Sequence, residues 1–331
     1  MGTRRQSRVH ELAVLLLLAL LASTLTQTAP PPAAAAEPRT IKVTTLGLCN
    51  EVYLPWAQEK GIFEKHGLKV ETVRTAGGAA GVAAIVSGSA DFSFTNGYTA
   101  IISYSQNFPV RFVAGAYETP LPPKPDAQGM IVKADSPYRE AKDLVGKRVG
   151  VNELGGVNQI ATSAWLRKNG IDPKSVKFVA LPFPELVPAL VQGRLDATQV
   201  PLQSIARQPP GTVRSLGDPF RLGLGKIVFA GYLTTKDFLE KNQPVVEAFQ
   251  RALAESVKQV KDPVNADAQF AVAAKYCNQD TALLARMPQQ EYEAFIDFET
   301  LKQMAETLVV EGPLQAAPNL EPFVPAFARK R

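Results

Sequence analysis

Residues 84–101 read AIVSGSADFSFTNGYTAI, and their pattern returns about a third of the chain later in residues 189–205, ALVQGRLDATQVPLQSI. Gly88 and Asp91 of the first copy correspond to Gly193 and Asp196 of the second. An apolar, helix-like run precedes each glycine, which can adopt a positive φ and end a helix. We therefore predict two equivalent units, each a helix, a glycine turn, a short strand and a polar loop that opens the next helix. Loops at the carboxyl ends of strands are where open α/β sheets bind small molecules.

Strand-like and helix-like segments alternate on both sides of this repeat, which predicts an α/β fold with mostly parallel sheets covered by helices. Three helices are expected near the C-terminus as a helical tail, at residues 244–261, 263–277 and about 289–311. Strands are expected at residues 40–45, 68–73, 91–94, 111–116, 130–133, 149–151, 176–181 and 226–233.

The segment YETPLPPKP, residues 117–125, contains four prolines in nine residues and suits an extended crossover between lobes. A second crossover is expected at residues 222–230. We therefore predict two lobes, the first from residues 37–125 plus 226–331 and the second from residues 126–225.

Size and charge narrow the class of protein. The chain has 331 residues, 46% of them hydrophobic, which is enough for about two domains. The formal charge of +5 falls to +3 without residues 1–36, and the Lys and Arg residues are scattered. This distribution of charge argues against a nucleic-acid partner. We also expect the protein to be a monomer.

The first 36 residues have the pattern of a secretory signal. Arg4, Arg5 and Arg8 precede the apolar run Leu12–Ala22, and Ala34–Ala36 offer a small-residue cleavage site before Glu37. The run is too short to span a bilayer easily. We expect a removed signal and a periplasmic mature chain, with a retained membrane anchor as the alternative.

Several kinds of chemistry are missing from the mature sequence. Its single histidine, His66, lies in an EKHG turn where we expect it to be solvated, and no Cys/His cluster has metal-ligand spacing. The glycine pairs lack nucleotide-binding patterns. We therefore predict no catalytic residue, no metal and no cofactor. Cys49 and Cys277 are expected as half-buried free thiols, the alternative being a disulfide, which needs Cα atoms within about 7 Å.

What remains is a set of polar and aromatic residues in loops at helix starts, where backbone N–H groups are unpaired. Five such loops are expected to converge on one cleft, with Asn96 and Gln199 facing each other across it. The alternative is that these residues simply cap helices. The predicted ligand-binding residues are Cys49, Asn50, Glu51, Tyr53, Gly78, Thr95, Asn96, Tyr98, Gly156, Val157, Asn158, Gln199, Pro201 and Gln203.

The charges of these loops restrict the ligand. None contains Lys or Arg, whereas Glu51, Glu118 and Glu153 lie nearby. We therefore expect a monoanion held by backbone N–H groups, a zwitterion, or a neutral or cationic heterocycle. Tyr117 and Phe183, like Tyr53 and Tyr98, are candidates for stacking on a ring or for ordinary packing.

Four segments carry a resemblance to a known family: YLPWAQEKGIFEKHGLKVE at residues 53–71, VSGSADFSFTN at 86–96, DLVGKRVGVNELGG at 143–156 and ALVQGRLDATQV at 189–200. Over residues 41–259 the chain resembles periplasmic substrate-binding proteins of ABC importers, in the class that serves nitrate, aliphatic sulfonates, taurine and thiamine-precursor pyrimidines. The resemblance implies a two-lobed periplasmic-binding-protein fold of type II that traps a small-molecule ligand. It also implies a membrane permease with a cytoplasmic ATPase as partners.

The resemblance is incomplete at two loops. Residues 49–51, Cys-Asn-Glu, and residues 198–201, Thr-Gln-Val-Pro, differ from the pattern typical of sulfonate and nitrate binders. Two other functions stay open. One is an enzyme on the same fold, related to thiamine-pyrimidine synthases, with Glu51 or Cys49 as the reactive group; the cysteine-rich catalytic run of those enzymes is absent here. The other is a ligand sensor subunit.

Overall fold

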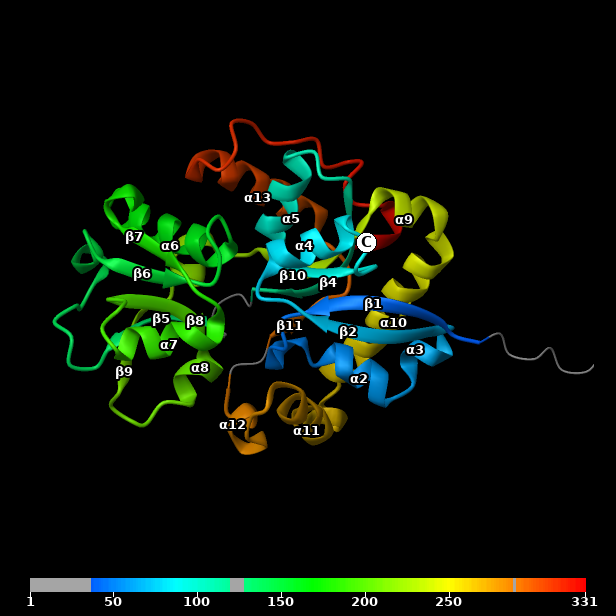
Figure 1. Cartoon of the computed structure of the whole chain (residues 1–331), viewed down its shortest axis with the longest axis horizontal. Coiled ribbons are helices and arrows are strands. Elements are labelled where there is room, and N and C mark those ends of the chain that lie inside the picture. The colour runs from blue at the N-terminus through cyan, green and yellow to red at the C-terminus, as the bar shows by residue number, and fades with distance from the viewer. Residues whose placement is uncertain (1–36, 120–127, 288–289) are drawn as a thin grey trace, which may run out of the picture. The chain divides into compact units, whose positions relative to one another are not determined.

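The computed structural model describes residues 37–119, 128–287 and 290–331 (Figure 1). The expected signal segment and most of the expected first crossover lie outside the described residues. The chain from Pro38 to Arg331 forms one compact unit. Within the described ranges, none of the helices combines the length and apolar character needed to cross a bilayer.

The first group of strands consists of a parallel pair and an antiparallel sheet. β1 (Arg39–Thr45) pairs with β2 (Leu68–Arg74), and Val43 bridges to Phe92. The sheet has the order β11-β4-β10-β3, from β3 (Ser93–Asn96), β4 (Val110–Glu118), β10 (Val228–Thr235) and β11 (Glu291–Tyr292). Its helices are α2 (Tyr53–Glu59), α3 (Ile62–Lys65), α4 (Gly78–Val86), α5 (Gly97–Ser105), α9 (Lys236–Lys241), α10 (Gln243–Lys261), α11 (Ala266–Cys277), α12 (Thr281–Ala285) and α13 (Phe298–Glu311), with short turns η1 (Cys49–Glu51), η5 (Pro263–Asn265) and η6 (Ala326–Ala328).

Aromatic rings fill the core of this first group. Phe92 stacks on Phe249 of α10 with ring centroids 4.2 Å apart, and Phe63 stacks on the same ring at 6.0 Å. All three side chains are fully buried. Helix α10 is therefore a main cover of the strands.

The second sheet has the order β7-β6-β8-β5-β9. Helix α6 packs on one face, where Trp165 meets Met130 and Val149, and α7 packs on the other, where Leu186 and Leu190 meet Ile131. The elements of this sheet are β5 (Gln128–Lys133), β6 (Arg148–Val151), β7 (Lys177–Ala180), β8 (Ala197–Pro201), β9 (Val213–Gly217), α6 (Val157–Lys168), α7 (Phe183–Val191), α8 (Leu202–Ala206) and the turns η2 (Ala141–Leu144), η3 (Pro173–Ser175) and η4 (Phe220–Leu224).

The α/β class is confirmed, but the expectation of mostly parallel sheets is wrong: every strand pair of the sheet β11-β4-β10-β3 is antiparallel, and the second sheet is mixed. Strand β5 runs antiparallel to β8 and β9, and β10 runs antiparallel to β3 and β4. Parallel neighbours need a crossover that returns within the same sheet. β5 and β10 each follow a segment that enters from the other sheet, so no such return constrains their direction.

The C-terminal region also differs from the prediction of three helices. Residues 291–292 form β11 and pair with Tyr117 and Glu118 of β4, and α13 begins only at Phe298. The helix starts there because the Asp297 side chain accepts a hydrogen bond from the Thr300 N–H at 3.0 Å. Strand β9 was not predicted either.

The two cysteines form a disulfide, so the expectation of free thiols is wrong. Cys49 and Cys277 have Cα atoms 5.0 Å apart. They meet because the C-terminal end of α11 packs against η1, a contact between residues 228 positions apart in the sequence. His66 is likewise bonded rather than merely solvated, with its Nε2 3.0 Å from a Glu255 carboxylate oxygen on α10.

Candidate functional site

Both copies of the repeated unit have the same local structure. Gly88 and Gly193 have φ angles of 76° and 74° and end α4 and α7. The Asp91 carboxylate accepts a hydrogen bond from the Lys42 N–H at 2.7 Å, and the Asp196 carboxylate accepts one from the Arg148 N–H at 2.8 Å. Each aspartate thus fixes the strand beside it, and the repeat builds the scaffold on which the following loop is held.

A cavity of about 400 Å³, including its open mouth, lies where loops of the first group and of the second sheet meet. Five predicted residues line it: Gly78, Thr95, Asn96, Val157 and Asn158. The other lining residues are Leu46, Leu48, Phe94, Tyr117, Gln128, Asn152, Phe183, Phe229 and Ala230.

Aromatic rings form one wall of the cavity. Tyr117 stacks on Phe229 with centroids 5.2 Å apart, and Phe94 lies 6.4 Å from the Tyr117 ring. Asn50 does not line this cavity, but its side-chain amide donates to the Tyr117 hydroxyl at 3.0 Å. Flat rings held in this way offer a stacking surface to an aromatic or planar ligand.

The polar part of the wall contains hydrogen-bonding atoms that have no protein partner. Thr95 Oγ1 and Asn152 Oδ1 are buried and unpaired. Gly78 is needed beside Thr95, because a Cβ atom at position 78 would lie 2.2 Å from the threonine hydroxyl. Buried polar atoms without partners are costly, so these two are the atoms that a bound ligand would satisfy.

Two other predicted residues at the cavity are engaged in the protein itself. Asn96 accepts from the Thr99 N–H at 2.8 Å and so caps α5, as the capping alternative expects. Asn158 donates to the Gln199 carbonyl oxygen at 3.3 Å. Only part of each side chain is left for a ligand.

The remaining predicted residues lie away from this cavity. Tyr53 and Tyr98 are fully buried in the core, and Pro201 pairs with Gln128 in the second sheet. Gln199 is buried and accepts a hydrogen bond from the Thr162 hydroxyl at 2.7 Å, so the structure does not bring its side chain opposite Asn96. Gly156 precedes α6 next to Glu153.

Cys49 and Gln203 line two neighbouring hollows instead of the main cavity. Cys49 has no free thiol, since it is bonded to Cys277. The structure therefore offers no reactive sulfur at the position considered for an enzyme.

Glu51 is a buried internal cap. Its carboxylate accepts from the backbone N–H groups of Leu48 at 2.9 Å and Leu46 at 3.2 Å, and the Thr45 hydroxyl also donates to it. Burial raises its pKa to about 7, although these hydrogen bonds and the Arg74 charge act in the opposite direction. The side chain is fully shielded from solvent and shapes the loop after β1.

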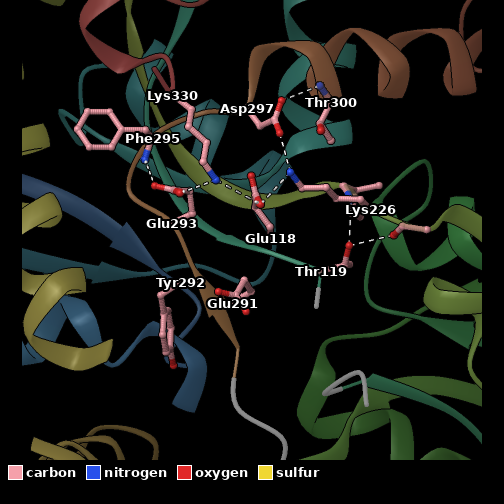
Figure 2. A network of polar contacts seen from close by, with 12 residues as sticks. Glu118, Thr119, Lys226, Glu291, Tyr292, Glu293, Phe295, Asp297, Thr300 and Lys330 are labelled. Carbon is pink, nitrogen blue, oxygen red and sulfur yellow. Dashed lines mark hydrogen bonds and ion pairs between the residues drawn. The ribbon is translucent and has the colours of Figure 1, made fainter. Parts of the chain in front are cut away.

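An ion-pair network joins the end of β4, the start of β10 and the start of α13 (Figure 2). Lys226 Nζ lies 2.6 Å from Asp297 and 3.3 Å from Glu118, the residue after Tyr117 of the aromatic wall. The Thr119 hydroxyl donates a hydrogen bond to the Gly225 carbonyl oxygen at 2.9 Å. This bond connects the first crossover with the second. Burial raises the pKa of Glu118, while the lysine charges oppose that shift.

The sequence analysis missed four polar or aromatic lining residues: Phe94, Gln128, Asn152 and Phe229. Phe94 lies next to the predicted Thr95, and Asn152 lies next to Glu153 in a polar loop, so proximity to the polar loops was the available signal. Gln128 begins β5 after the first crossover, Phe229 lies at the end of the second, and neither carries a motif. Among the described residues, no cluster of three or more His, Cys, Asp or Glu side chains is arranged to hold a metal ion.

The family follows from comparison with known proteins. The model of the NMT1/THI5-like family matches residues 51–266, more than half of the chain, and the chain belongs to this family.

A relative from Brachyspira hyodysenteriae, named as a periplasmic binding protein of an ABC transporter, is 26% identical over 199 residues. The match covers 57% of this chain and 54% of that protein, so the chain spans about half the length of this relative.

Solved structures show the same fold. The periplasmic aliphatic sulphonate binding protein SsuA of Escherichia coli has a TM-score of 0.66 at 20% identity, over 87% of this chain and 97% of that one. The periplasmic nitrate-binding protein NrtA of Synechocystis has a TM-score of 0.70 at 15% identity, over 86% and 84%. The fold is therefore that of periplasmic binding proteins.

Proposed function

We propose that this chain is the extracytoplasmic solute-binding component of an ABC importer. The observation that carries the proposal is the cavity between the two sheets, with its stacked aromatic wall and its unpaired polar atoms Thr95 Oγ1 and Asn152 Oδ1. The family, the fold and the name of the Brachyspira relative agree with this function.

In this proposal the two sheets belong to two lobes that close on the ligand. Residues 37–125 plus 226–331 form the first lobe and residues 126–225 the second, with hinge motion at the crossovers 117–125 and 222–230. The ion pair of Lys226 with Glu118 links the two crossovers, and Lys226 also pairs with Asp297.

The closed monomer would dock on a membrane permease that works with a cytoplasmic ATPase. Residues 1–36 would direct the chain to the periplasm and be removed there. The ligand is a small organic solute, and the names of the related structures suggest sulfonates among the first compounds to examine.

Ligand screening tests the proposal. Thermal melting and intrinsic fluorescence of the mature protein should respond to one member of a panel of sulfonates, taurine, pyrimidines, carboxylates and aromatic acids. Native mass spectrometry of the protein as purified should identify a retained solute. A folded protein that responds to none of these and carries no solute would refute a binding function.

A matched pair of variants ties the response to the cavity. Thr95→Val removes a hydroxyl that has no protein partner, so it should weaken ligand binding about tenfold with little change in stability. Thr40→Val makes the same change at an exposed position of β1 and should leave binding unchanged.

A further inference from the structure

A carboxylate from the second sheet caps a helix of the first group. Glu153 lies in the loop between β6 and α6, and its Oε1 accepts a hydrogen bond from the Ala79 N–H of α4 at 3.1 Å. The N-cap residue of α4 is Gly77, which has no side chain for this purpose. The cap of α4 is therefore supplied by a residue that belongs to the other sheet.

An arginine from the second sheet caps the C-terminal end of another helix of the first group. Arg207 follows α8, and its Nη2 donates to the carbonyl oxygens of Cys277 at 3.2 Å and Asn278 at 3.5 Å. Cys277 is the last residue of α11, and Asn278 is its C-cap. Because the last carbonyl groups of a helix have no partner within the helix, Arg207 fills a position that α11 leaves open.

Both side chains have the charge that their helix end favours. The start of a helix carries a partial positive charge and its end a partial negative charge. This applies to α4 with its 9 residues and to α11 with its 12. Glu153 is an acid at a start, and Arg207 is a base at an end. The two sheets are therefore joined by two electrostatically favourable contacts that use no acid–base pair.

These two closure contacts, Glu153 with Ala79 and Arg207 with Cys277, lie beside the main cavity. Ala79 follows Gly78, which lines the cavity, whereas Arg207 and Cys277 line an adjoining hollow. The hollow and the cavity share the lining residues Leu46, Leu48 and Phe183. Because each contact joins the two sheets next to the cavity, a hinge motion that opens the cavity there parts the contact.

The two closure contacts differ in their expected strength. Glu153 Oε2 is buried without a partner, and separation of the sheets would relieve this cost. Arg207 is exposed and has no such cost, and its Nη2 contacts two carbonyl oxygens. We therefore expect Arg207 to contribute more to closure than Glu153.

We propose that Glu153 and Arg207 are positioning residues for solute binding: they favour the closed arrangement of the two lobes by capping α4 and α11 from the opposite lobe. This inference rests on the proposed solute-binding function. The apparent affinity of a two-state protein scales with the population of its binding-competent state. Both residues therefore raise the affinity for the solute without contacting it. An ion pair of Arg167 with Glu311 also spans the lobes at 3.0 Å, so loss of both caps weakens closure and does not abolish it.

Pulsed electron double resonance tests this inference without any ligand. Spin labels attached at Glu64→Cys in α3 and Lys174→Cys in η3 place one label on each lobe, at exposed positions. The populations of the label-to-label distances then report the ratio of open to closed protein. Arg207→Ala should raise this ratio about tenfold and Glu153→Ala about threefold, because water replaces each cap when the lobes part. Small-angle X-ray scattering identifies the open form by its larger radius of gyration.

Glu185→Ala and Arg194→Ala are the matched controls. Glu185 is an exposed acid in the first turn of α7, and the Arg194 side chain bonds to Gln192 of its own lobe. Both controls should keep the wild-type populations. Arg207→Lys retains a positive charge at the end of α11 and should keep most of the closed population.

Thermal melting of each variant checks that it is folded. If either alanine variant does not fold, Glu153→Gln and Arg207→Gln take its place, because they keep the size of the side chain and remove its charge. Each should shift the populations in the same direction by a smaller factor.

Two results would overturn the inference: folded variants whose distance populations equal those of the wild type, or controls that shift as far as the variants do. Neither result affects the proposed function, which the solute screen decides. Conversely, a wild type that responds to no solute and retains none argues against the proposed function, whereas a shift in the variants still shows which residues hold the lobes together.

Discussion

The two copies of the glycine and aspartate unit, residues 84–101 and 189–205, have the same backbone and different uses. In both, the glycine ends a helix with a positive φ and the aspartate binds the backbone of a neighbouring strand. Beyond the aspartate the copies diverge. The first places Thr95 and Asn96 on the cavity, whereas the second buries Gln199 against Thr162 and pairs Pro201 within a sheet.

This difference shows that the repeat specifies the structural unit that holds the following loop. It does not by itself create two binding surfaces. Which copy faces the ligand depends on the elements packed around it. All five residues of β8 are buried, and Gln199 is held by Thr162 of α6. The first three residues of β3 are also buried, but Asn96 at its end is only half-buried and lies with Thr95 at the cavity.

The largest expected effect concerns the disulfide, which is present only in the half that contains the first copy. Replacing Cys49 and Cys277 by Ser should lower the free energy of unfolding by about 3 to 5 kcal/mol, because the closed loop is long. Urea denaturation measures the loss. Hydrogen exchange should show a larger loss of protection around β3 than around β8. An equal loss in both copies would contradict the expectation that the disulfide stabilises mainly the half that contains the first copy.

The next effect compares two buried carboxylates in strand-to-helix loops, Glu51 after β1 and Glu153 after β6. The folded-state pKa of Glu51 is about 7 against an ordinary 4.5, so the folded protein retains a proton that the unfolded chain loses. Stability should therefore fall as pH rises from about 4.5 to 7, by up to about 3 kcal/mol. Glu51→Gln should abolish this loss in denaturation measured at several pH values.

The same pH measurement on a Glu153 variant extends the test to the second carboxylate. Its pKa is also raised, so Glu153→Gln should remove a further part of the decline with pH. An unchanged pH profile in Glu51→Gln would show that the buried carboxylate does not titrate in this window.

The two aspartates should have similar structural effects of about 2 kcal/mol each, since Asp91→Ala and Asp196→Ala each leave a strand N–H without its partner. Asp196→Ala should cost somewhat more, because the Arg148 side chain also pairs with this carboxylate at 3.0 Å. Thermal and urea denaturation of both variants provide the measurement. If only one variant is destabilised, the structural equivalence of the copies fails.

The smallest effect concerns the residues that open the next helix in each copy, Asn96 and Pro201. Asn96→Ala removes the cap of α5 and should cost about 1 kcal/mol. Pro201 is buried in β8 and makes no side-chain cap on α8, so Pro201→Ala removes packing contacts but no capping hydrogen bond. Hydrogen exchange should therefore show a frayed first turn of α5 in Asn96→Ala and an unchanged first turn of α8 in Pro201→Ala; fraying in both variants would show that the second copy also depends on its capping position.

The sequence predicts local features of this fold well. The glycine turns and the strands around the repeat depend on neighbouring residues, so their patterns can be read from the chain. The cavity members Gly78, Thr95 and Asn158 were found because polar loops at helix starts have a recognisable composition.

The features that were missed depend on contacts between distant segments. The directions of β5 and β10 depend on which sheet the chain enters, and the disulfide depends on how α11 packs on η1. Phe229 and Gln128 reach the cavity because of those strand directions. The partners of Glu51 are local, but its burial is not, and burial changes its role from a candidate ligand contact to an internal cap.

The bond between Cys49 and Cys277 also sets the covalent topology of the chain. Every residue of the second sheet, from Gln128 to Gly217, lies between the two cysteines and therefore inside one closed ring. A protease that cuts once within this ring leaves a single covalently connected molecule, which separates into two fragments only after reduction. The ring can close only after α11 has been synthesised, so oxidation of this pair marks a chain whose two ends have already come together.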